Sequence, residues 1–250
     1  MSTQAAITLP PIAGYHPTTL IDWPGRLAAI VFLPQCNLRC RFCHASAMLA
    51  PPQEAIPLES ILAHLDERRG WLDGVVICGG EPTVWPTLAP LCEVFRGRGL
   101  GVKLDTNGTH PDCLAGLLAA GLVDAVAMDL KAPLDGRYRQ VCGDAADVDA
   151  VGRSIDLLMS SAVDYEFRTT VCPAFIGEAE VRAMGERIAG ARRWILQRFE
   201  PAHALDPALR TVRPYDPPVM ESLAAIGRRY VARCLVRGQP ERCCGRAPVV

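Results

Sequence analysis

The sequence lacks an excess of charge of either sign. Its 26 basic and 27 acidic residues leave a formal net charge of -1. This balance argues against a nucleic-acid-binding protein, which would carry a clear basic surplus, so we expect no nucleic-acid partner. Lysine is also scarce, because Lys103 and Lys131 are the only two lysines and every other basic residue is an arginine.

Long apolar runs are missing as well. The longest near the start is 27–33, far too short to span a bilayer. The first twenty residues show no basic segment followed by an apolar one, so we expect no signal peptide, no membrane contact and a cytoplasmic location. In such a reducing setting, 11 cysteines indicate metal binding or free buried thiols rather than a disulfide framework.

Short apolar runs alternate with amphipathic segments along 250 residues that are 50% hydrophobic. The runs are rich in branched and aromatic residues, which is typical of buried parallel strands. The sequence therefore predicts an α/β fold, as an open sheet or a partial barrel, in one domain over 1–250. Its core is about 15–205, and a tail over 206–250 packs on it with one helix at 219–234. The predicted strands are 27–33, 74–78, 102–105, 125–130, 165–171 and 194–199, and the predicted helices are 57–69, 86–98, 111–120, 147–160 and 178–189.

Nearly every chemically suggestive group follows the end of a predicted strand. Carboxyl ends of parallel strands meet at one face, where α/β proteins bind their ligands. This coincidence predicts a single site more strongly than any one motif does. The motifs are CNLRCRFCH (36–44), CGGEPT (78–83), DTNGT (105–109), MDLKAP (128–133), RTTVCP (168–173) and RFEPAHALD (198–206).

The first motif holds three cysteines spaced C-x3-C-x2-C, namely Cys36, Cys40 and Cys43. Structural zinc sites and simple ferredoxin clusters normally use four protein ligands. Three cysteines favour a [4Fe–4S] cluster with one iron left open to a small molecule. Two alternatives stay open: a zinc site completed by His44 or a distant cysteine, and three unrelated thiols. Cys234, Cys243 and Cys244 carry no usable motif and are expected to be free thiols.

In the GGEP motif, Gly79 and Gly80 could simply form a turn that ends the strand. The alternative is a close approach of the backbone to a ligand, with Glu81 accepting hydrogen bonds from an ammonium group. The three cysteines one strand earlier favour the ligand.

At this point the chain resembles a known family. Three cysteines after the first strand, an aromatic Phe42 before the third of them, and GGEP after the second strand resemble the radical S-adenosylmethionine superfamily. The stretches TTLIDWPGRLAAIVFLPQCNLRCRFCH, CGGEPT, KLDTNGT, MDLKAP and YEFRTTVCP together resemble the activating proteins of anaerobic ribonucleoside-triphosphate reductase, which are glycyl-radical-enzyme activases. Two departures are Gln35, where glycine often precedes the first cysteine, and Cys78, where serine is common.

The resemblance implies a partial (β/α)6 TIM-like barrel and a radical oxidoreductase. In this family S-adenosylmethionine chelates the open iron of a [4Fe–4S] cluster. One electron from the reduced cluster then cleaves S-adenosylmethionine to methionine and a 5′-deoxyadenosyl radical. That radical then abstracts a hydrogen atom. The cofactor carries the chemistry, so no catalytic side chain beyond the cluster is implied.

The resemblance also assigns roles by position. Gly79, Gly80 and Glu81 would hold the methionyl ammonium, and Phe42 would lie near the adenine. Further cofactor contacts fall on Asp129, Lys131 and His203. The alternatives for the last two are a surface lysine and a loop histidine that makes local hydrogen bonds. Arg168 could bind a carboxylate or pair with Asp129. A possible Na⁺ or K⁺ would be held by Asp105, the Thr106 hydroxyl, the Met128 carbonyl and Asp129, although the two aspartates could equally cap loops.

The implied partners are a glycyl-radical enzyme, in the first place anaerobic ribonucleoside-triphosphate reductase, and a flavodoxin- or ferredoxin-type electron donor. Two other functions remain open. One is a small-molecule radical enzyme of the 7-carboxy-7-deazaguanine synthase type. The other is a non-catalytic iron–sulfur or zinc-binding module, which would not explain why the later motifs gather at one face.

Overall fold

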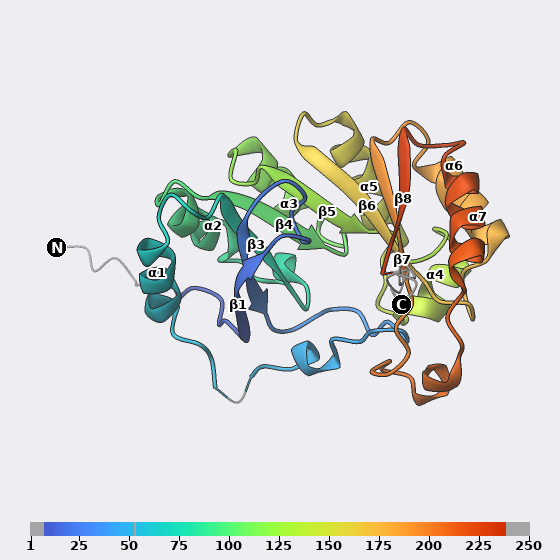
Figure 1. Cartoon of the computed structure of the whole chain (residues 1–250), viewed down its shortest axis with the longest axis horizontal. Helices are drawn as coiled ribbons and strands as arrows, with labels where there is room; N and C mark the ends of the chain where they lie inside the picture. The colour runs from blue at the N-terminus through green and yellow to red at the C-terminus, as the bar shows by residue number, and fades with distance from the viewer. Residues whose placement is uncertain (1–7, 53, 239–250) are drawn as a thin grey trace, which may run out of the picture.

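The computed structural model describes residues 8–52 and 54–238 of the chain. Within them, eight strands form one sheet whose spatial order follows the chain, from β1 to β8. β1 runs antiparallel to β2, and all later neighbours are parallel (Figure 1). The strands are β1 (Gly14–Thr19), β2 (Ala28–Leu33), β3 (Gly74–Gly79), β4 (Gly101–Thr106), β5 (Ala125–Asp129), β6 (Asp164–Val171), β7 (Arg193–Arg198) and β8 (Arg233–Arg237).

The α-helices line the outer side of this curved sheet (Figure 1). Their first turns are fixed by local chemistry. Asp147, for example, accepts a hydrogen bond from the Ala150 amide at the start of α5, and Pro111 occupies the first turn of α3. The helices are α1 (Leu58–Glu67), α2 (Leu88–Arg96), α3 (Pro111–Ala119), α4 (Gly136–Cys142), α5 (Val148–Ser160), α6 (Glu178–Arg187) and α7 (Pro217–Gly227), with short 3-10 turns η1 (Ser46–Leu49), η2 (Pro82–Val84) and η3 (Pro207–Thr211).

The partial-barrel prediction is confirmed, and each of the six predicted strands is present. The sheet has two further strands at its edges, β1 and β8, which the sequence pattern did not reveal. An edge strand is covered on fewer sides and needs no continuous apolar run. β1, for instance, contains Pro17, which an edge strand tolerates because one row of its backbone groups stays unpaired.

The helix predicted over 219–234 is wrong in its second half. α7 ends at Gly227, and Cys234 lies in β8, paired with Trp194 of β7. The turn brings Gly227 directly against Cys234, where an added Cβ would come within 2.6 Å of the Cys234 sulfur. α4 is also additional, since no helix was predicted over 136–142.

The amino end of the barrel interior is closed by an indole ring. Trp23, in the turn between β1 and β2, packs with Ala28, Ile30 and Val76 in a small apolar cluster inside the barrel. Its ring lies against Gly74 and Gly101 at the starts of β3 and β4. Since this end is filled, space for a ligand lies toward the carboxyl ends of the strands.

Candidate cluster and cofactor site

A cavity of about 310 Å³ lies at the carboxyl ends of the strands. Its walls come from segments far apart in the sequence: the loop after β2, the ends of β3 to β7, and the start of the loop after β5. All three cysteines of the C-x3-C-x2-C motif line it. It is also lined by Phe42, Gly79, Gly80, Glu81, Asp105, Thr106, Asp129, Lys131 and Arg168.

The loop that carries the cysteines is fixed by backbone hydrogen bonds on two sides. The amides of Arg39 and Arg41, which flank Cys40, donate to the carbonyl oxygens of Cys142 and Val141 at the end of α4, each at 2.9 Å. On the other side, the Leu205 amide donates to the Cys43 oxygen at 2.9 Å. The loop is therefore held by α4 and by the segment after β7, which both lie next to it.

The three thiols differ in environment. Burial raises the pKa of Cys36 to about 11 and also raises the pKa of Cys43. A hydrogen bond from the Cys142 thiol lowers the pKa of Cys40 to about 7. The Cys36 sulfur accepts from the Leu38 amide at 3.4 Å and from the Asn107 side chain at 3.9 Å. A bound metal would stabilise all three thiolates, which burial alone disfavours.

The arrangement of the cysteines does not match a site for a single metal ion. In the described part of the chain, no group of three or more His, Cys, Asp and Glu side chains is arranged to hold one metal ion. A tetrahedral zinc site would draw its ligands to about 2.0–2.3 Å from one centre. A four-iron cluster is wider and keeps its thiolates further apart.

The three cysteines near the end of the sequence were predicted to be free thiols. Cys234 lies buried in β8, whereas Cys243 and Cys244 fall outside the described residues.

The GGEP segment packs backbone against backbone on the residues just before Cys36. The Gly80 amide donates to Leu33 at 2.8 Å, and the Glu81 amide donates to Gln35 at 2.7 Å. A Cβ on Gly80 would overlap the Gln35 carbonyl, and Gly79 has φ +119°. Both positions therefore require glycine, which leaves the backbone exposed to a ligand in the cavity.

Glu81 is fully buried, and its carboxylate faces inward as well as lining the cavity. One oxygen accepts from the Thr83 amide at 3.1 Å and from the Thr83 and Thr106 hydroxyls, each at 2.6 Å. The other accepts from the Asn107 amide at 2.5 Å. Burial raises the pKa of this carboxyl, although the four donors oppose the shift. Glu81 thus joins the ends of β3 and β4; its contact with a cofactor ammonium stays a prediction.

Five charged side chains form a continuous ionic chain across the inner faces of β4, β5 and β6. Asp105 is held by Lys103 and Arg168, each at 2.6 Å. Asp129 is held by Arg168 and Lys131, each at 3.0 Å. Burial opposes ionisation, but Lys131 and Arg168 lower the pKa of Asp129 to about 2. Four of these five side chains line the cavity, two of each sign, whereas Lys103 does not line it.

The predicted Na⁺ or K⁺ site falls on the same carboxylates. All four oxygens of Asp105 and Asp129 already face a lysine or arginine nitrogen, and the Thr106 hydroxyl donates to Glu81. This donor set does not form the oxygen-only cage that a hard cation prefers. A cation at this site stays a prediction.

Of the remaining predicted cofactor contacts, one lines the cavity and one does not. Phe42 is buried in the cavity wall, with the Lys131 ammonium 5.9 Å from its ring centre. His203 is exposed on the loop after β7 and does not line the cavity. Two polar ties were missed by sequence reasoning, although DTNGT was noted as a motif. Asn107 donates to Asn37 at 3.0 Å, and Asn37 donates to Thr109 at 2.8 Å, which joins this motif to the cysteine loop.

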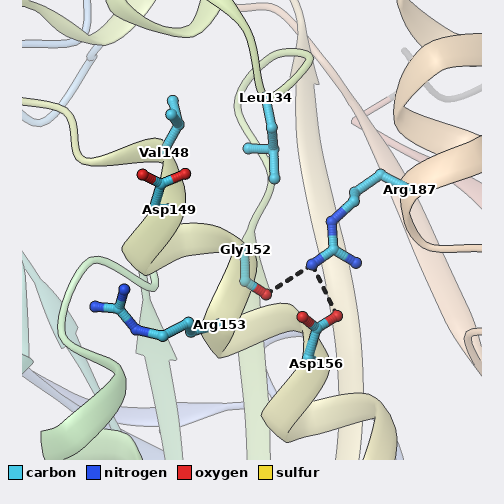
Figure 2. Close-up of a pocket in the computed structure, with 7 residues that line it drawn as sticks. All are labelled: Leu134, Val148, Asp149, Gly152, Arg153, Asp156 and Arg187. Atoms are coloured by element: carbon cyan, nitrogen blue, oxygen red, sulfur yellow. Dashed lines mark hydrogen bonds and ion pairs between the residues drawn. The ribbon is translucent and has the colours of Figure 1, made fainter.

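A second hollow, of about 370 Å³, lies between α5 and α6. In Figure 2, Arg187 of α6 reaches to the Gly152 carbonyl at 2.8 Å and to Asp156 at 2.7 Å. None of the predicted site residues lines it. The cavity at the strand ends is therefore the candidate functional site.

Comparison with known families identifies the superfamily to which the chain belongs. The family model described as "Radical SAM superfamily" matches residues 30–182, which is more than half of the chain. The protein is a member of the radical SAM superfamily. Membership implies a [4Fe–4S] cluster and S-adenosylmethionine, and the matched region contains all the cavity residues named above.

Relatives within the superfamily point to two activities. A protein of Methanocaldococcus jannaschii, provisionally named a glycyl-radical enzyme activating enzyme, is 27% identical over 231 residues, which cover 90% of this chain and 95% of that protein. A 7-carboxy-7-deazaguanine synthase of Neisseria meningitidis is 31% identical, but over only 49% of this chain and 52% of that protein.

A solved structure agrees on the fold. A domain of the pyruvate-formate lyase-activating enzyme of Bacteroides vulgatus superposes with a TM-score of 0.54 at 14% identity, covering 66% of this chain and 99% of that one. At this identity the match shows the fold alone. No helix in residues 8–52 and 54–238 is both long and apolar enough to cross a bilayer.

Proposed function

We propose that this radical SAM protein is a glycyl-radical-enzyme activase. One observation carries the proposal: the three motif cysteines, the GGEP backbone and four of the five members of the ionic chain all line the same cavity. A cluster, the amino group of a cofactor and its carboxylate would each find a matching wall there. A non-catalytic cluster module explains this arrangement less well, because it would need neither the GGEP backbone nor the ionic chain beside the cluster.

In this proposal Cys36, Cys40 and Cys43 hold the cluster. The fit rests on their shared cavity and on the glycine-only backbone beside it, where a Cβ at Gly80 would fill the space next to Gln35. The Gly79–Gly80 backbone and Glu81 hold the methionyl ammonium of S-adenosylmethionine. When bound and reduced, the cluster supplies the electron that splits this cofactor and starts radical chemistry.

The other residues orient the cofactor and exclude water. Lys131 lies at one end of the ionic chain and combines a buried stem with a compact ammonium, which suits a carboxylate in a tight site. Its pKa is raised well above the usual value: burial alone would lower it, but Asp129 beside it more than compensates. Lys131 therefore stays charged at any physiological pH. Phe42 offers an apolar face for the adenine.

The length over which the relatives align supports an activase within the superfamily. The relative named for that activity aligns over nearly its whole length, whereas the deazaguanine synthase aligns over about half. An activase also needs an accessible cavity, because its substrate is a glycine in a loop of a second protein. Anaerobic ribonucleoside-triphosphate reductase is the partner that we propose first, with a flavodoxin or ferredoxin as the electron donor.

The test mixes the reconstituted, reduced protein and S-adenosylmethionine with a glycyl-radical enzyme from the same cell under anaerobic conditions. Electron paramagnetic resonance should show a doublet from the remaining α-hydrogen of glycine, and the doublet should collapse when glycine is deuterated. Cys40→Ala is the control that should give no signal. If the cofactor is cleaved, no partner gains a radical and a carboxylated pterin is consumed instead, the deazaguanine-synthase reading replaces this one.

A further inference from the structure

Tyr138 is the residue that the site leaves unexplained. It lies in α4, is 0% exposed, and its hydroxyl has no hydrogen-bond partner among the described residues. A buried hydroxyl without a partner costs free energy, so such groups are rare unless a ligand or ion completes them. The hydroxyl therefore indicates an acceptor that the polypeptide itself does not supply.

Tyr138 lies behind the cavity wall and is not one of the residues that line it. The charged and polar groups that influence its pKa are Cys142, Lys131, Cys40 and Asp129, and all but Cys142 line the cavity. Burial, the largest effect, raises the pKa of Tyr138 well above its usual value. The side chain is thus a neutral phenol that can donate one hydrogen bond toward the cysteine loop.

Backbone hydrogen bonds hold the end of α4 next to the loop that carries Cys40. Arg39 and Arg41, on either side of Cys40, donate to Cys142 and Val141 of this helix at 2.9 Å. The Cys142 thiol in turn hydrogen-bonds to the Cys40 sulfur. One turn of helix separates Cys142 from Tyr138, so both side chains belong to the same face, which backs Cys40.

We propose that the Tyr138 hydroxyl donates a hydrogen bond to the Cys40 end of the bound cluster, either to the Cys40 sulfur or to an adjacent sulfide, and so raises the reduction potential of the cluster. The proposal rests on the assignment of Cys36, Cys40 and Cys43 as cluster ligands. A donor to cluster sulfur stabilises the reduced, more negative state over the oxidised one. In this proposal Tyr138 sets the reduction potential of the cluster and takes no part in the bond-breaking steps.

The measurement is the midpoint potential of the reconstituted cluster, by redox titration followed with electron paramagnetic resonance. Tyr138→Phe removes the hydroxyl and keeps the ring, so the packing around the ring should be preserved. We expect the potential to fall by an amount equal to a tenfold change in the reduction equilibrium, about 59 mV for one electron, with iron content unchanged. Tyr165→Phe, at another buried tyrosine in β6, is the matched control and should not shift it.

A second variant keeps the test decisive if Tyr138→Phe fails to assemble a cluster. Replacing Tyr138 with 3-fluorotyrosine preserves the shape and makes the hydroxyl a stronger donor, so the potential should rise. Opposite shifts in the two variants, or a rise in the second alone when the first loses iron, support the proposal. An iron-loaded 3-fluorotyrosine protein with an unshifted potential overturns it. Failure of the unsubstituted protein to bind iron would overturn the ligand assignment instead, so the two failures are distinguishable.

Discussion

The carbonyl oxygen of Gln35 accepts a hydrogen bond from the Glu81 amide at 2.7 Å. This bond joins the residue before the first motif cysteine to the GGEP segment, although 45 residues lie between them in the sequence. Gln35 adopts φ +68°, a left-handed conformation that glycine reaches more easily. Glutamine therefore adopts this conformation at a cost in free energy that glycine would not carry.

The first prediction concerns Gly80. Gly80→Ala should destabilise the protein by more than about 3 kcal/mol, because the new Cβ would overlap the Gln35 carbonyl, a backbone atom that cannot move aside alone. Chemical denaturation of the apo-protein measures this loss. Gly116→Ala is the control: Gly116 lies within α3 with open space around it, so alanine should stabilise by about 0.5–1 kcal/mol. Equal stability of the Gly80→Ala and unsubstituted proteins would contradict the packing described.

The second prediction concerns Glu81. Glu81→Ala removes the acceptor of four hydrogen bonds from Thr83, Thr106 and Asn107. The stranded donors should lower the free energy of unfolding by about 3 kcal/mol, before any cofactor is added. Glu93→Ala, at an exposed position in α2, should change it by less than about 0.5 kcal/mol. If only cofactor affinity falls and stability is unchanged, the inward role of Glu81 is wrong and the ammonium role alone remains.

The third prediction concerns the metal. Anaerobic reconstitution should load about four irons per chain, and Cys36→Ala, Cys40→Ala or Cys43→Ala should abolish the loading. Cys172→Ala and Cys92→Ala are matched controls, since both thiols are buried yet neither lines the cavity. Each control should keep its iron. Stoichiometric zinc without iron in the unsubstituted protein would reject the cluster.

The six inner strands could be predicted because burial on both faces demands continuous apolar runs such as AAIVFL of β2. The two edge strands could not, since RCLVR of β8 is half polar and looks like a loop. Its pairing with β7 depends on contacts 40 residues away in the chain, between Arg193 and Arg233 for example. Edge strands are specified by the sheet that they join rather than by their own pattern.

At the site, the motifs predicted which segments lie together but not the hydrogen-bond and ion-pair partners of each side chain. Glu81 was expected to face a ligand, and the structure gives it four internal donors as well. Asp105 and Asp129 were considered as cation ligands, and the structure pairs each with two positive side chains. Tyr138 carried no motif at all. Such partnerships are set by side-chain geometry across strands, which spacing along the chain does not encode.

The last prediction concerns acid stability and the ionic chain. The ordinary pKa of an aspartate is 3.8; burial would raise it, but Lys131 and Arg168 lower the pKa of Asp129 to about 2 in the folded protein. A lowered carboxyl pKa stabilises the fold above the unfolded-state value, and the benefit is lost as the pH falls through the folded-state value. The ionised Asp129 should therefore contribute about 2 kcal/mol above about pH 4.5, and this should decline between about pH 4 and pH 2.

Asp129→Asn isolates this contribution, because the amide has nearly the same shape and does not titrate. The unsubstituted apo-protein should exceed the variant in unfolding free energy by the largest amount above about pH 4.5, and the difference should shrink as the pH approaches 2. Asp156→Asn is the control, since it breaks an ion pair with Arg187 in which the carboxylate is 68% exposed, and such surface pairs contribute little. A difference for Asp129→Asn that is constant from pH 6 to pH 2 would mean that Lys131 and Arg168 do not stabilise the ionised carboxylate, and the ionic chain would then have no role in stability.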